Sequence, residues 1–200
     1  MSRSSSPATS RWFEASLAYA GPLARGLNLL GERAWSSWED PPRVQLSEES
    51  LLGDVQLLHA FWETLEALSK RRPQLRVFWK DRSSVFLGAS LAFAADAGLD
   101  LDALVGRIDT DAEIAWSRQG AKFRRDDEAV MGSAQPRLNI LERQDERGTG
   151  TRWLVTSKVP LVDGDEVVGI LGAYDIVSRS EALAVSRRHA KTAGRSGEGE

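Results

Sequence analysis

Cysteine is absent from the 200 residues of the chain, and this excludes disulfides, thiolate metal sites and cysteine nucleophiles. No apolar run approaches the roughly 20 residues of a membrane-spanning helix. The first residues also lack the charged and apolar segments of a secretory signal. The formal net charge of −3 gives no basic surface for nucleic acid. These absences predict a cytoplasmic protein without a transmembrane segment that does not bind nucleic acid.

Short catalytic motifs are absent as well. The sequence contains no GxSxG elbow, no HExxH, no P-loop and no dinucleotide fingerprint. Acidic pairs, Asp109 with Asp111 and Asp126 with Asp127, could suggest a divalent cation. Acidic residues near helix starts are more often caps or solvated positions, so we expect neither a metal site nor an enzyme.

Helical patterns dominate the first 73 residues. Residues 1–43 are expected to form an extension, Ser-rich and disordered at first and then helical, with a break at Gly21-Pro22. Its tryptophans could dock on a partner or a membrane surface, but packing on the chain's own domain is the simpler explanation. Residues 44–73 are expected to form a flanking amphipathic helix with an apolar stripe at heptad spacing: Leu51, Val55, Leu58, Trp62 and Leu65.

The period of the pattern changes at Leu75. "LRVFWKD" and "SVFLG" are expected to form two strands, followed by several short helices and then three antiparallel strands around "RLNILERQ", "WLVTSKVPL" and "GILGAYDIV". This order predicts an α+β domain over residues 74–178, with one sheet and helices on one of its faces. Residues 179–200 are predicted to form a polar C-terminal tail.

The ordered set of these segments resembles the PAS domain family. The segments are "VFWKDRSSVFLGASLAFAADAGL", "LVGRIDTDAEIAW", "FRRDDEAVMGSAQPRLNILE", "WLVTSKVPL" and "GILGAYDIV". They are most similar to bacterial sensor PAS domains found upstream of histidine kinases and diguanylate cyclases. The resemblance implies a five-stranded antiparallel sheet with short helices on one face and the N-terminal helix on the other. Ser90 replaces an asparagine common in the family, and Val177 replaces a threonine.

The resemblance also implies a ligand cradle on the inner sheet face. The candidate cradle residues are Trp116, Phe123, Asn139, Leu154, Thr156, Lys158, Leu171 and Ala173. Asn139 could contact a ligand or, alternatively, bond within a turn or the sheet. Lys158 on an apolar face needs an anionic partner, either a ligand carboxylate or, as the simpler account, a protein carboxylate such as Asp109, Asp111 or Asp175. Asp175 and Ile176 lie where the family couples its sheet to an output segment.

The other sheet face needs a cover, because the last two strands lack a polar side. The stripe from Leu51 to Leu65 is expected to pack on it, within one chain or across a dimer. The expected contact residues on the sheet are Trp153, Val155, Tyr174 and Ile176.

The sequence does not identify a cofactor. A flavin–cysteine adduct is excluded, and a histidine-ligated haem is not expected, because His59 and His189 lie outside the cradle. The sequence predicts a bacterial signalling module that senses a small molecule or a partner, acting as a homodimer or with a separate signalling protein. A ligand-free dimerisation scaffold is the alternative. A cone-shaped isomerase or dehydratase with Asp109 or Asp111 as base is a remote one.

Overall fold

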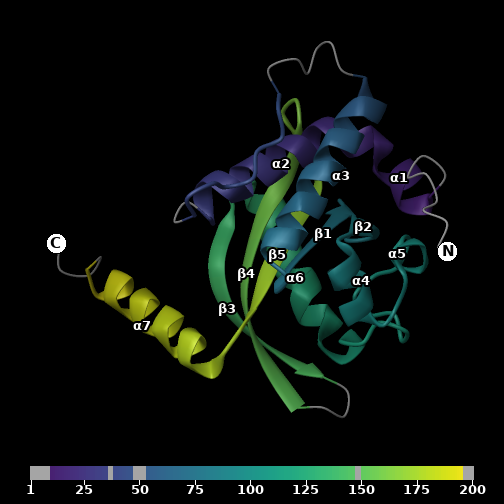
Figure 1. The fold of residues 1–200 in the computed structure, drawn as a ribbon. Helices are drawn as coiled ribbons and strands as arrows, with labels where there is room; N and C mark the ends of the chain where they lie inside the picture. The colour runs from purple at the N-terminus through teal and green to yellow at the C-terminus, as the bar shows by residue number, and fades with distance from the viewer. Residues whose placement is uncertain (1–9, 36–37, 47–52, 147–149, 196–200) are drawn as a thin grey trace.

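A five-stranded antiparallel sheet forms the centre of the molecule (Figure 1). The computed structural model describes residues 10–35, 38–46, 53–146 and 150–195. The strands are β1 (Leu75–Asp81), β2 (Phe86–Ala89), β3 (Arg137–Glu146), β4 (Gly150–Asp163) and β5 (Glu166–Val177), in the spatial order β2-β1-β5-β4-β3. All four neighbouring pairs are antiparallel. The predicted α+β class and the five-stranded sheet are therefore confirmed.

Short helices cover the inner face of the sheet. They are α4 (Leu91–Ala97), α5 (Leu101–Leu104), the 3-10 turn η3 (Ser117–Gln119) and α6 (Gly120–Ser133). Ser90 caps α4, because its hydroxyl accepts a hydrogen bond from the Phe93 amide at 3.4 Å. Asp100 caps α5 in the same way, through the Ala103 amide at 2.8 Å. Two side-chain caps thus stabilise the starts of helices that are too short to be stable alone.

The N-terminal region covers the outer face with more helices than the sequence predicted. It contains α1 (Arg11–Ser16), the 3-10 turn η2 (Leu17–Tyr19), α2 (Ala20–Arg33) and α3 (Asp54–Arg71). Pro22 lies in the first turn of α2, where its missing amide costs no hydrogen bond, so the break falls at η2 instead. Gly26 lets α2 approach the sheet, since an added Cβ would lie 2.9 Å from the Leu161 side chain.

Aromatic contacts join α1 and α3 to β1. The Trp79 ring packs edge-on against Phe61 of α3, with 5.2 Å between the ring centroids. Trp12 stacks on Trp62 with 4.3 Å between the ring centroids. Trp79 Nε1 also donates to the buried Ser16 hydroxyl at 2.8 Å. The Trp-rich segment therefore packs on its own domain, as the simpler account predicted.

The predicted stripe on α3 is correct in part. Leu58 and Leu65 are fully buried and Trp62 is half-buried, but Val55 is 43% exposed. Leu51 lies outside the described residues. The buried face is centred instead on Leu57, Leu58, Phe61, Leu65 and Leu68, because an 18-residue helix follows the 3.6-residue period of a straight helix.

A bulge between β4 and β5 overturns the predicted facing of β5. Asp163 pairs with Glu166 at the turn, and without a bulge this register would set Ala173 opposite Thr156. The register shifts between Leu161 and Val162, so Thr156 pairs with Tyr174 instead. Directly paired residues share a face, and one extra residue moves every later side chain to the other face. Leu171 and Ala173 therefore face the N-terminal helices, while Tyr174 faces inward.

The predicted polar tail forms a helix, α7 (Arg179–Arg195), which projects from the end of β5 (Figure 1). Its start is a capping box. The Ser178 hydroxyl accepts from the Glu181 amide at 3.3 Å, and a Glu181 oxygen accepts from the Ser178 amide at 2.7 Å. The S-x-x-E spacing of Ser178 and Glu181 was the signal that could have predicted this helix. Within the described part of the chain, no helix has both the length and the apolarity to cross a bilayer.

Candidate ligand cavity

A small cavity lies between the inner face of the sheet and the short helices. Its volume is about 30 Å³, which is enough for one or two water molecules. Five aromatic side chains line it: Phe78, Phe93, Trp116, Phe123 and Tyr174. The remaining lining residues are Lys80, Asp109, Glu142, Gln144, Leu154, Thr156 and Lys158. The cavity thus has aromatic walls that are interrupted by polar and charged side chains.

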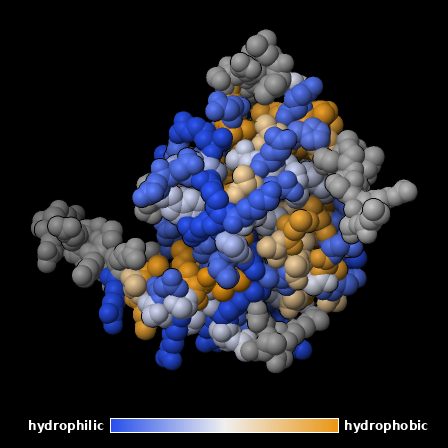
Figure 2. Space-filling model, viewed as in Figure 1, coloured by the Kyte–Doolittle hydropathy of each residue, from blue (hydrophilic) through white to orange (hydrophobic). Residues whose placement is uncertain are grey.

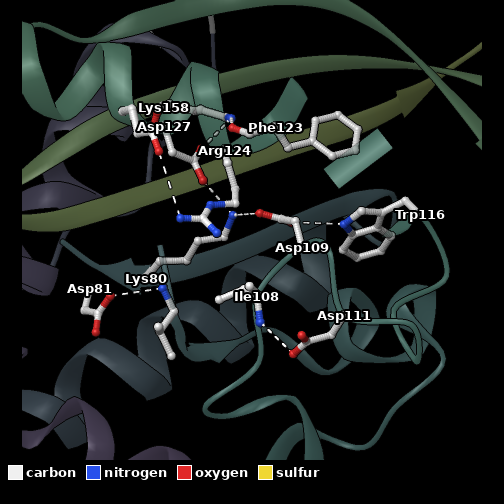
Figure 3. A network of polar contacts seen from close by, with 12 residues as sticks. Lys80, Asp81, Ile108, Asp109, Asp111, Trp116, Phe123, Arg124, Asp127 and Lys158 are labelled. Carbon is white, nitrogen blue, oxygen red and sulfur yellow. Dashed lines mark hydrogen bonds and ion pairs between the residues drawn. The ribbon is translucent and has the colours of Figure 1, made fainter. Parts of the chain in front are cut away.

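Buried charges form a continuous chain beside the cavity (Figure 3). Lys80 Nζ donates to Asp109 Oδ2 at 2.5 Å and to Asp127 Oδ2 at 2.6 Å. Lys158 Nζ donates to Asp127 Oδ1 at 2.6 Å. Trp116 Nε1 closes one end by donating to Asp109 Oδ1 at 3.0 Å. We call Lys80, Asp109, Asp127 and Lys158 the charge tetrad, and none of these side chains is more than 3% exposed.

The tetrad is electrically balanced, with two ammonium and two carboxylate groups. Burial acts against the charged form of Lys80, but Asp109 and Asp127 outweigh it and raise the lysine pKa. Burial likewise acts to raise the pKa of Asp127, while Lys80 and Lys158 outweigh it and hold the pKa below the ordinary value of 3.8. Both groups are therefore charged at neutral pH.

Local structure explains how the tetrad is assembled. Lys80 points inward because its neighbour Trp79 points outward along the same strand. Asp127 lies one helical turn after Phe123 on α6, so both face the sheet. Gly120, at the start of α6, allows the helix to touch the loop that carries Asp109. A Cβ there would lie 2.3 Å from the Asp109 carbonyl oxygen.

Two polar side chains of the cavity lie outside the tetrad and have unused hydrogen-bonding capacity. Within the described residues, the Thr156 hydroxyl has no hydrogen-bond partner, although the residue is only 2% exposed. The Glu142 side chain is 6% exposed, and its Oε1 atom forms an ion pair with Lys122 Nζ at 3.5 Å. A buried hydroxyl without a partner is unfavourable, so the site favours an occupant that bonds to it.

A second polar cluster closes the cavity near Tyr174. The Tyr174 hydroxyl donates to Asp96 at 3.1 Å, and Asp96 also pairs with Arg76 at 2.8 Å and with Arg152 at 3.4 Å. Arg152 Nε donates in turn to Gln144 at 3.0 Å. Burial and the adjacent Asp96 carboxylate raise the pKa of Tyr174 well above 10.0, so the phenol stays neutral.

Five of the eight predicted cradle residues line the cavity: Trp116, Phe123, Leu154, Thr156 and Lys158. The other three do not line it. Leu171 and Ala173 are turned away by the bulge. Asn139 is exposed and has a left-handed φ of 55°. Its backbone amide donates to Ser157 Oγ at 2.9 Å on the opposite side of the sheet.

Lys158 has the simpler of its two predicted partners, a protein carboxylate, but Asp127 supplies it. Lys80 was not among the predicted cradle residues, and Asp127 was considered only as a possible ligand of a divalent cation. A charged residue within the apolar strand "LRVFWKD" was the available signal for Lys80. Within the described residues, no group of three or more acidic or histidine side chains is arranged to hold a metal.

The predicted coupling and interaction residues divide between the two faces. Tyr174 and Ile176 were expected on the outer face, but Tyr174 lines the cavity and Ile176 pairs with the cavity residue Leu154, which places it on the same inner face. Trp153 and Val155 are half-buried on the outer face, and Val155 lines an open groove near α7.

Asp175 pairs with Arg72, just after α3, at 2.7 Å, and Arg72 lies over the Trp38 ring. Burial raises the pKa of Asp175 despite this arginine. The Ile176 amide donates to the Gln74 carbonyl at 3.4 Å.

Solved structures share this architecture. VqmA of Vibrio cholerae, a dimer described among the LuxR-type receptors, is 20% identical, with a TM-score of 0.50 over 58% of this chain and 52% of that one. The match thus spans about half the length of VqmA. The PAS domain of BvgS from Bordetella pertussis is 22% identical over 66% of this chain and 97% of that domain, with a TM-score of 0.46. No curated protein matches the sequence. A family model described as the PAS fold matches residues 71–181, which is more than half of the chain, so the protein belongs to the PAS family of signal-sensing modules.

Proposed function

We propose that this chain is a cytoplasmic sensor of bacterial signal transduction, in which a small molecule in the inner cavity changes how the outer helices pack. One observation carries the proposal. The Thr156 hydroxyl is buried at the cavity without a partner among the described residues, beside Glu142 and Gln144. A filled and purely structural core would satisfy or omit such a group.

A short route connects the cavity with the outer helices. Lys80 borders the cavity, and the preceding residue of β1, Trp79, contacts Phe61 of α3. Tyr174 borders the cavity, and the next residue along β5, Asp175, pairs with Arg72. A ligand shifts the helical packing only if it binds one arrangement more tightly than the other. These two strands are where such a difference would be transmitted.

The alternative is a ligand-free dimerisation or interaction scaffold, and two observations favour it. The cavity holds only about 30 Å³. In addition, hydrophobic surface is visible where α7 leaves the body of the molecule (Figure 2), and Leu183 of α7 is 52% exposed. In either case we propose that the output passes to a second copy or a separate signalling protein, without catalysis and without nucleic acid.

Native mass spectrometry of the freshly purified chain tests the proposal. A mass excess that is lost on denaturation supports the sensor. An unliganded mass combined with a stable dimer supports the scaffold. An unliganded monomer whose helices do not respond to any small molecule contradicts both.

A further inference from the structure

The carboxylates of the charge tetrad already balance the charge of both ammonium groups at the cavity. Lys80 is bonded to two carboxylates and Lys158 to one, and the Lys158 ammonium also lies 3.4 Å from the Phe123 carbonyl oxygen. An anionic ligand would therefore meet two lysines whose charge is already balanced by Asp109 and by the fully buried Asp127. Burying a further anion without a free cation is costly.

Two cavity side chains outside the tetrad, Glu142 and Thr156, have hydrogen-bond acceptor capacity left over. Glu142 adds one carboxylate beyond the balanced tetrad, and its partner Lys122 has a side chain that is 46% exposed. The hydroxyl of Thr156 is free to accept or donate a hydrogen bond. Gln144 already accepts from Arg152. Glu142 can only accept hydrogen bonds and Thr156 is able to accept one, so these two side chains suit a molecule that donates hydrogen bonds.

We propose that the cavity selects a small molecule that is neutral or carries one positive charge, presents N–H donors to Glu142 and Thr156, and excludes anions. This inference rests on the proposed sensor function. The volume of about 30 Å³ requires either an occupant of a few heavy atoms or outward movement of the aromatic walls. In this proposal Lys158 is the ion-pair partner of Asp127 and does not anchor a ligand carboxylate.

Three probes of similar shape and different charge test the selection on the full chain: acetamidinium, acetamide and acetate. The indole N–H of Trp116 reports occupancy, because it donates to Asp109 at the cavity wall. Its NMR signal is assigned with Trp116→Phe. Acetamidinium and acetamide are expected to shift this signal saturably. Acetate, at matched ionic strength, is expected to leave it unchanged.

Glu142→Gln removes the extra charge while keeping the side-chain shape. It should weaken acetamidinium binding about tenfold and acetamide binding much less, because hydrogen bonds to charged groups are the stronger ones. Glu128→Gln is the matched control, since Glu128 lies on the same helix as Asp127 with a side chain that is 60% exposed. Thr156→Val should weaken binding of both probes.

Two results would overturn the inference, and they can be told apart. Acetate binding as tightly as acetamidinium would disprove the charge selection and leave a ligand cavity in place. No saturable shift with any probe, together with an unliganded native mass, would disprove the selection and the sensor function together.

Discussion

Replacing Asp127 by asparagine is the most direct test of the charge tetrad. Asp127 accepts from Lys80 and from Lys158, both at 2.6 Å, and its side chain is fully buried. Asparagine keeps the size but loses the charge, and it can turn an amide N–H₂ group toward an ammonium. Lys80 would keep Asp109, whereas Lys158 would keep only the Phe123 carbonyl at 3.4 Å.

The expected cost is large. Removing one partner of a buried ion pair costs about 3–5 kcal/mol, against a typical total stability of about 5–15 kcal/mol. With a urea m-value of about 2 kcal/mol/M, the unfolding midpoint should fall by roughly 2 M. Equilibrium urea unfolding at neutral pH, followed by circular dichroism, measures this shift.

A double variant and a surface control make the test specific. Asp127→Asn combined with Lys158→Met leaves the balanced pair of Lys80 and Asp109, so it should be more stable than Asp127→Asn alone. Glu32→Gln breaks an exposed pair with Arg43 and should cost less than about 1 kcal/mol. If Asp127→Asn unfolded within about 1 kcal/mol of the natural chain at an unchanged m-value, the tetrad would not be a stabilising element and the reasoning would be wrong.

Three further predictions concern pH, the outer face and the cavity. Because the pKa of Asp127 lies below 3.8, its contribution is complete above that value and is lost as the pH falls through the lowered pKa. As the pH is lowered, the free energy of unfolding should therefore fall more steeply for the natural chain than for Asp127→Asn. Parallel curves of unfolding free energy against pH would contradict this. Ser16→Ala should cost about 1–3 kcal/mol in urea unfolding by leaving Trp79 Nε1 unbonded. Ser69→Ala, whose hydroxyl bonds within its own helix, should cost much less. Thr156→Val should raise the thermal stability of the unliganded chain by about 1 kcal/mol, and a loss of stability would show that the hydroxyl is already satisfied.

Much of the fold could be predicted from local patterns. Strand periodicity placed Leu154, Thr156 and Lys158 on one face of β4, and the structure puts all three at the cavity. The change from helical to strand period near Leu75 coincides with the start of β1. These features are readable because each depends on residues a few positions apart.

The errors arose where a distant contact decides the outcome. Asp127 resembles a solvated acidic residue of a helix until β1 and β4 bring Lys80 and Lys158 to it. Asn139 resembles an inward strand residue until its left-handed φ shows that it stands at an irregularity of the β3–β4 register. Neither the charge partner nor the irregularity is written in the neighbouring residues.

The sequence by itself therefore determined the class of fold and the positions of the strands, because hydrophobic period and capping residues act locally. Only the tertiary structure decided which face of β5 meets the cavity, since one bulged residue reverses the alternation that the sequence displays. It also decided that the cavity's lysines are neutralised from within, because the four members of the tetrad come from β1, the loop after α5, α6 and β4.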